Sequence, residues 1–237
     1  MNIGMGDDFA VSGELFAINY ARRALGSAGP LIVFDVGANL GGYANAVIQE
    51  LRGQLDLYCF EPSKAAFQRL SQALSGAQNV HLLSIGLSDV NGSLLLYSDT
   101  ACSGLASFYR RRLDHFGNSM PFSEEVTTRT LDSFCSEHGI SHINFLKLDV
   151  EGHELRVLEG ARELMADSCI DFIQFEFGGC NIDSRTFFQD FYYLLNPRFR
   201  IYRILRKGLA SIDHYRETLE QFVTTNFLAV GRRAVPS

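Results

Sequence analysis

The segment Leu31-Ile-Val-Phe-Asp-Val-Gly-Ala-Asn-Leu-Gly-Gly-Tyr43 is the part of the sequence that most clearly predicts the fold. Its first four residues form an apolar run that is too short for a helix and contains β-branched side chains, which predicts a buried parallel strand. Asp35 follows, then glycines at 37, 41 and 42, and then a helical pattern to about residue 51. A strand, a carboxylate, a glycine-rich turn and a helix in this order indicate a site for a nucleotide-like ligand at the carboxyl edge of a sheet. The alternative is an ordinary strand–turn–helix corner.

The spacing of the turn bears on which ligand it takes. The dinucleotide motif is G-x-G-x-x-G, but here Asn39 occupies the position of the second glycine. That glycine lets a pyrophosphate lie against the turn, and the carboxylate of Asp35 would repel a phosphate. A positively charged ligand fits better. S-adenosyl-L-methionine (SAM) carries an ammonium and a sulfonium and no phosphate, so the turn favours SAM over NAD.

A second carboxylate supports a nucleoside ligand. Leu57-Tyr-Cys-Phe-Glu-Pro62 predicts the next strand, and Glu61 at its end lies near the position where an acidic residue binds ribose hydroxyls in a βαβ unit. This carboxylate does not distinguish SAM from NAD, because both contain ribose. Pro62 ends the strand, and Ser63 is predicted to cap the following helix.

The alternation of patterns from residue 31 onward predicts one α/β domain over 31–237, preceded by an N-terminal helical extension over 1–30 with a helix at 13–25. We expect seven main strands, at 31–36, 56–61, 80–85, 143–150, 170–177, 200–205 and 222–230. The helices between them are expected near 42–52, 63–75, 130–139, 153–165, 184–195 and 214–221. The long polar segment 99–125 interrupts this rhythm, and we interpret it as a lid or substrate loop.

Carboxylates recur where the expected strands end. They are Asp35, Glu61, Asp149 with Glu151, and Glu176. Such groups are costly to bury unless they meet water, a cation or a ligand donor, so a binding site explains them better than packing does. Lys147 alternates with Asp149 along its strand, so it is expected either to pair with a carboxylate or to lie at the sheet surface.

Four motifs in order carry a resemblance to a known family. They are D-V-G-A-N-x-G-x-Y at 35–43, F-E-P at 60–62, L-S-D at 87–89 and K-L-D-V-E-G-x-E at 147–154. Over roughly residues 31 to 178 the chain resembles the FkbM family of SAM-dependent methyltransferases. The resemblance implies a Rossmann-like seven-stranded SAM methyltransferase sheet with helices on both faces and an antiparallel last strand. It also implies O-methylation of a hydroxyl on a small-molecule natural product or a sugar.

The pattern and the resemblance together assign the residues of the site. Those expected around the methionine part of SAM are Asp35, Gly37, Asn39, Gly41 and Tyr43; Glu61, Pro62 and Ser63 are expected at the ribose, and Asp149 at the methyl group. The resemblance adds Gly86, Leu87 and Ser88 at the adenine. Methyl transfer to a hydroxyl is helped by a general base, for which the candidates are Asp149, Glu151, His153 and Glu176. No metal ligands are assigned.

The net charge and the cysteine content limit the classes of binding partner and the cellular compartment that we expect. The net charge of −6 argues against a nucleic-acid or anionic-membrane partner, because both select basic surfaces. The five cysteines are odd in number and form no C-x-x-C motif, which indicates a reducing compartment, and with no visible secretory leader we expect a cytoplasmic protein. Basic clusters occur at 110–112 and 198–207, and we interpret them as solvated faces, with a groove for an anionic substrate as the alternative.

Two other classes of function stay open at this stage. An NAD-dependent oxidoreductase is disfavoured by the missing second glycine and by the lack of a Tyr-x-x-x-Lys pair after the core strands. A non-catalytic SAM-fold scaffold protein is disfavoured by the intact acidic series. Within the methyltransferases, N- or C-methylation of a small molecule is a further possibility. The sequence fixes neither the acceptor nor the oligomeric state, nor whether a divalent ion takes part.

Overall fold

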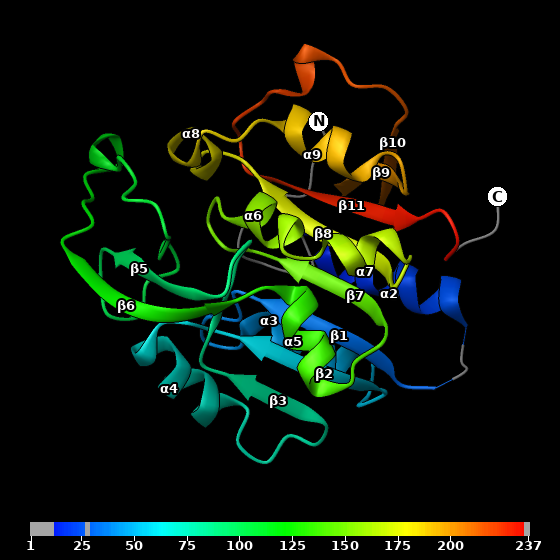
Figure 1. The fold of residues 1–237 in the computed structure, drawn as a ribbon, viewed down its shortest axis with the longest axis horizontal. Coiled ribbons are helices and arrows are strands. Elements are labelled where there is room, and N and C mark those ends of the chain that lie inside the picture. The colour runs from blue at the N-terminus through cyan, green and yellow to red at the C-terminus, as the bar shows by residue number, and fades with distance from the viewer. Residues whose placement is uncertain (1–11, 27–28, 235–237) are drawn as a thin grey trace.

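The computed structural model describes residues 12–26 and 29–234, so the part of the predicted extension before Ser12 lies outside the description. Within these residues the main sheet has eight strands in the order β10-β9-β11-β8-β7-β1-β2-β3. Their bounds are β1 Leu31–Val36, β2 Leu55–Phe60, β3 Val80–Leu83, β7 Ile143–Leu148, β8 Ile170–Phe177, β9 Phe199–Leu205, β10 Gly208–Ile212 and β11 Thr225–Gly231. Strand β1 pairs in parallel with β2 and β7, and β11 runs antiparallel to β8 and β9. The predicted Rossmann-like class and the antiparallel last strand are therefore confirmed (Figure 1).

The prediction of seven strands misses β10. This strand forms an antiparallel hairpin with β9, in which Gly208 lies opposite Leu205. It is short, and its residues are exposed or half-buried, so its sequence has no strong apolar alternation. The helix expected at 214–221 is absent from this described stretch, which contains only the short 3-10 turn η2 (Glu217–Leu219).

A second, three-stranded sheet lies beside the main one at its carboxyl end (Figure 1). It consists of β4 (Gly86–Leu87), β6 (Phe122–Arg129) and β5 (Gly92–Ser98), in that order. The segment between β5 and β6 contains one 3-10 turn, η1 (Asp114–Phe116), and corresponds to most of the predicted lid or substrate loop. Strand β6 begins three residues before the end of that predicted loop, so part of the segment is strand.

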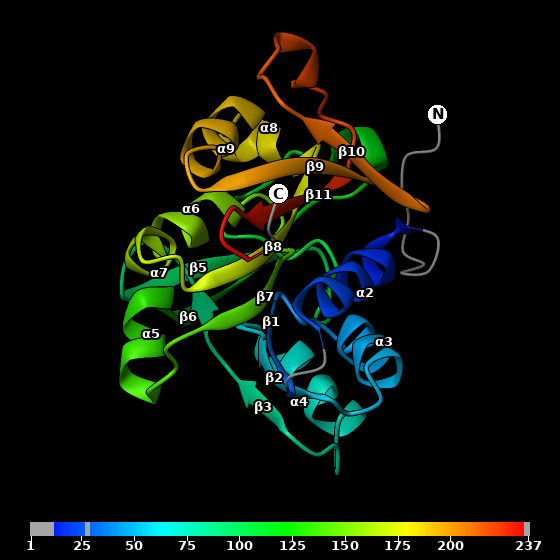
Figure 2. The ribbon, with the colours of Figure 1, turned by 90° about the vertical axis from the view of Figure 1, so that its right-hand side faces the viewer.

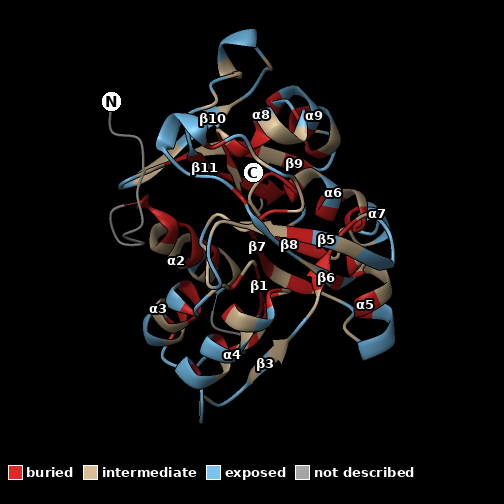
Figure 3. Ribbon diagram, turned by 90° about the vertical axis from the view of Figure 1, so that its left-hand side faces the viewer, coloured by how far each residue is buried: buried red, intermediate tan, exposed pale blue. Residues whose placement is uncertain are grey.

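Helices cover both faces of the main sheet, as predicted (Figure 2). One face carries α2 (Glu14–Leu25), α3 (Gly42–Glu50) and α4 (Lys64–Ala73). The other carries α5 (Leu131–His138), α6 (Glu154–Glu159), α7 (Arg162–Ala166) and α9 (Phe188–Leu195), with the short α8 (Cys180–Ser184) before the last. The central strands β1, β7, β8 and β11 are almost entirely buried, whereas the edge strands β3 and β10 contain no buried residue. Exposed residues lie mainly on the outer sides of the helices and in the loops (Figure 3).

Two expected helices are broken. The helix predicted over 153–165 divides into α6 and α7 at Gly160, where a Cβ would lie 2.1 Å from the backbone oxygen of Ser88. The helix predicted over 184–195 starts later, because Ser184 ends α8, and α9 begins where Asp190 accepts a hydrogen bond from the Phe187 amide at 2.8 Å. Close approach of a neighbouring loop explains the first break, and a side-chain cap sets the second boundary.

Helix α2 is packed into the core of the sheet. Its residues Ala17, Ile18 and Ala21 are completely buried, in one cluster with side chains from six strands of the sheet. Before it, Gly13 lies so close to β9 that a Cβ would be 2.5 Å from the backbone oxygen of Leu205. Among the described residues no helix combines the length and the apolar character needed to span a membrane.

Candidate active site

A cavity lies at the carboxyl ends of β1, β2 and β7. The empty space between its walls, counted out to the open solvent, is about 640 Å³. Seven of the residues predicted to bind cofactor line it: Gly37, Asn39, Glu61, Pro62, Gly86, Leu87 and Asp149. The segment after β5 closes its other side with Ser103, Gly104, Ala106 and Phe108.

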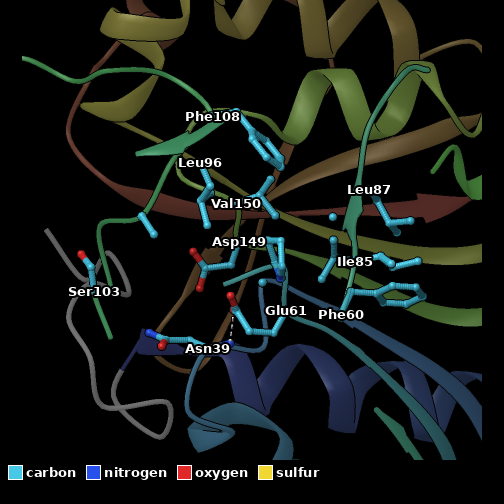
Figure 4. A pocket seen from close by; sticks show the side chains of 16 residues that line it. Asn39, Phe60, Glu61, Ile85, Leu87, Leu96, Ser103, Phe108, Asp149 and Val150 are labelled. Carbon is cyan, nitrogen blue, oxygen red and sulfur yellow. Dashed lines mark hydrogen bonds between the residues drawn. The ribbon is translucent and has the colours of Figure 1, made fainter. Parts of the chain in front are cut away.

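The cavity has an apolar end and a polar end (Figure 4). Phe60, Ile85 and Leu87 lie together at the apolar end, which suits a flat, uncharged ring. Glu61 and Asp149 lie at the polar end and carry its carboxylates. Neither arginine, lysine nor histidine lines the cavity, so its described walls offer no cation to a phosphate group.

The turn after β1 requires a backbone without a side chain at Gly37. Its φ is +86°, and a Cβ would lie 1.9 Å from the backbone oxygen of Asp149, so only glycine fits. Asn39 also has positive φ, at 46°, which asparagine tolerates better than most residues. Its side-chain oxygen is buried without a hydrogen-bond partner among the described residues, and Asn39 itself lines the cavity. An orphaned acceptor in this place fits a ligand that donates a hydrogen bond.

Glu61 is held by the backbone at the end of β2. One carboxylate oxygen accepts from the Asn39 amide at 2.9 Å, and the other accepts from the Ser63 amide at 2.8 Å. Burial raises the pKa of Glu61 to about 7, against the lowering effect of these two hydrogen bonds. The carboxylate is thereby fixed in direction and retains lone pairs that can accept from the hydroxyl groups of a ligand. Ser63 occupies the first position before α4, but its hydroxyl makes no capping hydrogen bond.

Asp35 lies beneath the cavity and does not line it. It is completely buried, and one of its carboxylate oxygens lies 3.2 Å from the Lys147 ammonium. The same ammonium lies 3.2 Å from Asp149, whose side chain is 37% exposed, and 4.6 Å from the ring centre of Tyr43. Of the two possibilities for Lys147 in the sequence, pairing with a carboxylate is the correct one. Gly41 and Tyr43 are likewise buried below the cavity.

The remaining acidic candidates gather beside Asp149, outside the lining of the cavity. Ligand atoms of Glu151, Glu176 and Cys180 lie within 4.8 Å of one another, the kind of group that could hold a cation. Arg111 from the long segment forms an ion pair with Glu151 and lies 3.8 Å from Asp183. Burial and the charge of Asp149 raise the pKa of Glu151 to about 8, with Arg111 opposing the rise. Burial and the surrounding carboxylates hold the pKa of Glu176 well above its ordinary value.

His153 is buried outside the cavity lining, between Ser88 and Tyr109 of the long segment. One ring nitrogen lies 2.9 Å from the Ser88 hydroxyl, and the other lies 3.3 Å from the Tyr109 hydroxyl. Burial lowers the pKa of this imidazole to about 4, so it is neutral near pH 7. Both nitrogens are occupied by protein partners, which suits a residue that connects two loops.

The sequence analysis did not assign three residues of this region to the site. Arg111 was seen only as part of an arginine cluster, and nothing local marks it as a partner of Glu151. Glu154 is completely buried and accepts from the amides of Val150 and Gly152 at 3.0 and 3.2 Å. The motif D-V-E-G-x-E was a usable signal for it. Glu14 was treated as part of a separate extension, yet it is buried and bonded to Gln174 on β8.

Comparison with known proteins fits this geometry. The family described as Methyltransferase FkbM domain matches residues 35–217, most of the chain. The chain therefore belongs to the FkbM methyltransferase family, which confirms the predicted family and, with it, SAM as the cofactor. The orphaned Asn39 oxygen, the fixed Glu61 carboxylate and the apolar end of the cavity fit that cofactor.

Two relatives and one solved structure illustrate the similarity. The protein named 2-O-methyltransferase NoeI, from Sinorhizobium fredii, is 30% identical over 145 residues, covering 56% of this chain and 58% of the relative. The protein named hexuronic acid methyltransferase AglP, from Haloferax volcanii, is 28% identical over 131 residues, covering 54% and 49%. This chain therefore matches only about half the length of each relative. The CurJ carbon methyltransferase structure shares the fold with a TM-score of 0.50 at 10% identity, covering 95% of this chain and 56% of that one.

Proposed function

We propose that this protein is a SAM-dependent O-methyltransferase that acts on a hydroxyl of a sugar or another small molecule. The observation that carries the proposal is the Glu61 carboxylate, fixed by two backbone amides in the wall of a cavity that has an apolar end. Membership of the FkbM methyltransferase family supports the reaction type. The names of the two relatives, a 2-O-methyltransferase and a hexuronic acid methyltransferase, support a hydroxylated acceptor.

The residues that would hold the cofactor follow from the walls of the cavity. Glu61 would accept from the ribose hydroxyls, and the apolar end near Leu87 would take the adenine. Asn39 and Asp149 would receive the amino-acid part, with Gly37 and the buried Asp35 below it. When bound, SAM supplies an electrophilic methyl group.

The protein then has to orient the acceptor hydroxyl and remove its proton. We assign the acceptor's proton to Glu176, which lies beside Glu151 and whose raised pKa makes it, once ionised, a stronger base than an exposed carboxylate. Asp149 lies nearer the cavity but is engaged by Lys147, Glu151 is engaged by Arg111, and His153 has both nitrogens occupied. In this assignment these three residues orient the site and Glu176 accepts the proton.

The segment 99–125 would cover the bound ligand. Ser103, Gly104, Ala106 and Phe108 line the cavity, and the Ser107 hydroxyl donates to the backbone oxygen of Glu151 at 2.8 Å. These contacts support its interpretation as a lid or substrate loop. The acidic net charge and the free thiols are in keeping with action on small molecules in the cytoplasm.

Calorimetric titration with SAM, S-adenosylhomocysteine and NAD tests the cofactor half of the proposal. We expect binding of the first two and no binding of NAD, with the SAM affinity lost in Glu61→Ala and kept in the exposed control Glu50→Ala. A preference for NAD would overturn the proposal. The acceptor half is tested by incubation with SAM and a panel of neutral, amino and uronic sugars, and detection of a mass increase of one methyl group on oxygen. Methylation confined to nitrogen or carbon would contradict O-methylation.

A further inference from the structure

A row of buried polar side chains crosses the sheet beneath the cofactor cavity. Asp35 on β1 lies opposite Lys147 on β7, and Lys147 lies opposite Gln174 on β8. All three are at most 2% exposed, in a layer that is otherwise apolar. Burying three polar residues in one row is costly, so their retention points to a role beyond packing.

Helix α2 adds a fourth member from outside the residues that match the family. Glu14 in its first turn is 5% exposed and accepts a hydrogen bond from the Gln174 amide at 3.1 Å. Its other oxygen accepts from the Ser12 hydroxyl at 2.7 Å. The family match begins at residue 35, so this carboxylate is a feature of the present chain that the match does not cover.

The charges of this row do not balance. Around the Lys147 ammonium stand the carboxylates of Asp35, Asp149 and Glu14. Burial alone would lower the pKa of Lys147, but these three carboxylates raise it well above its ordinary value. Burial raises the pKa values of Glu14 and Asp35, and the charge of Lys147 opposes the rise in both. Once both groups are ionised, one ammonium faces three carboxylates, and the excess negative charge extends to Asp149 in the cavity wall.

We propose that Glu14 is a positioning residue of the cofactor site: with Asp35 and Asp149 it outnumbers Lys147, and the resulting negative potential favours the sulfonium of SAM over the uncharged thioether of S-adenosylhomocysteine. Helix α2 then contributes to the function of the cofactor site through Glu14. The inference rests on the proposed function, since it needs the cavity to bind SAM. Its consequence is easier release of the product, whose sulfur has lost its charge.

The test compares the two ligands on one variant. Glu14→Gln keeps the shape and an acceptor for Gln174 but removes the charge. At pH 8, calorimetry should give a ratio of SAM affinity to S-adenosylhomocysteine affinity that is roughly three- to tenfold lower than in the wild type, the size expected for one charge acting through a protein interior. Lys147→Met removes the positive charge and should raise the ratio of SAM affinity to S-adenosylhomocysteine affinity. This variant tests the role of charge independently if Glu14→Gln does not fold.

Two controls separate charge from packing. Glu50→Gln removes an exposed carboxylate that also contacts α2, through Asn19 at 2.8 Å, and should leave the ratio unchanged. Gln174→Met removes the donor to Glu14 without changing any charge, and should affect both ligands alike. If Glu14→Gln also weakens both ligands equally, the inference is overturned and the proposed function stands. If the wild type binds neither ligand, both fail.

Discussion

Gly37 and Asp149 approach each other so closely that a Cβ on Gly37 would lie 1.9 Å from the backbone oxygen of Asp149. The Asp149 amide donates to the Val36 backbone oxygen at 3.0 Å, so the ends of β1 and β7 are joined on both sides of this contact. Both residues line the cavity, and their separation sets the shape of its polar end.

Gly37→Ala should therefore damage the site more than a glycine substitution elsewhere. The added carbon must push the ends of β1 and β7 apart, in a turn whose φ of +86° already disfavours alanine. We expect a loss of at least about 1 kcal/mol in unfolding free energy and a large loss of SAM affinity, measured by denaturant titration and calorimetry. Gly76→Ala is the matched control, because its φ is +82° but no atom lies within 4 Å of its Cβ. Equal effects of the two substitutions on SAM affinity would show that the contact is irrelevant to binding.

The pH dependence of SAM binding should follow Glu61. Its pKa is raised to about 7 by burial, and ribose hydroxyls need the ionised carboxylate as acceptor. Affinity should be constant above that pH and fall about tenfold for each unit below it. Glu151 and Glu154 also have raised pKa values, about 8 and about 7, but neither lines the cavity. Glu61→Gln should thus bind weakly with a flat profile between pH 5 and 8, and a persistent slope in this variant would assign the proton to another group.

Glu176→Gln tests the assignment of the general base. The amide keeps the size of the side chain but cannot take the acceptor proton, so kcat should fall by about a hundredfold or more. SAM affinity should change little, because Glu176 is outside the cavity lining. Rates and affinities are compared with those of Glu163→Gln, an exposed carboxylate on α7. A normal kcat for Glu176→Gln would remove it from the mechanism.

The variant His153→Asn distinguishes two possible roles of His153, as a general base or as a residue that connects two loops. With a pKa of about 4 the imidazole is uncharged over the working range, and its two nitrogens bond Ser88 and Tyr109. We expect a moderate loss of activity with an unchanged pH profile, measured as kcat between pH 6 and 9. If kcat falls as much as in Glu176→Gln and its pH dependence changes, His153 is the general base.

The site residues that lie within one strand and the turn after it were predictable from the sequence. Asp35, Gly37 and Asn39 belong to one strand and its turn, and Glu61 ends the next strand, so local pattern placed all four near one sheet edge. What local pattern could not tell was which of them reach the cavity. Asp35 points below it because Lys147, more than a hundred residues away, offers a buried ammonium at 3.2 Å.

Long-range contacts also explain the errors in the fold. The helix expected over 153–165 has continuous apolar spacing, but Gly160 must yield to the backbone of Ser88. Strand β10 has little apolar pattern and exists because β9 offers it a hydrogen-bonding edge. The helix pattern at 13–25 was correct, yet its amphipathic spacing gave no sign that Glu14 would bond Gln174 on the sheet.

The ion pair between Arg111 and Glu151 should fasten the long segment over the site. Arg111 is 8% exposed and Glu151 18%, so removal of the cation leaves a poorly hydrated carboxylate. At pH 9, above the Glu151 pKa of about 8, Arg111→Met is expected to lower the unfolding free energy by about 3 kcal/mol, measured by denaturant titration. The variant should also raise KM for the acceptor.

The pH dependence of that loss gives a sharper test. Arg111 lowers the pKa of Glu151, which burial and Asp149 raise to about 8, so the variant should hold the proton to still higher pH. A carboxyl whose folded pKa is raised stabilises the protein below its unfolded pKa of about 4.5 and loses that contribution as pH rises through the folded value. The deficit of Arg111→Met relative to wild type should thus grow from pH 6 to pH 9. In the double variant with Glu151→Gln no charge is left to neutralise, so the deficit should be smaller and flat. A deficit that does not vary with pH in the single variant would mean that Arg111 acts through packing and not through Glu151.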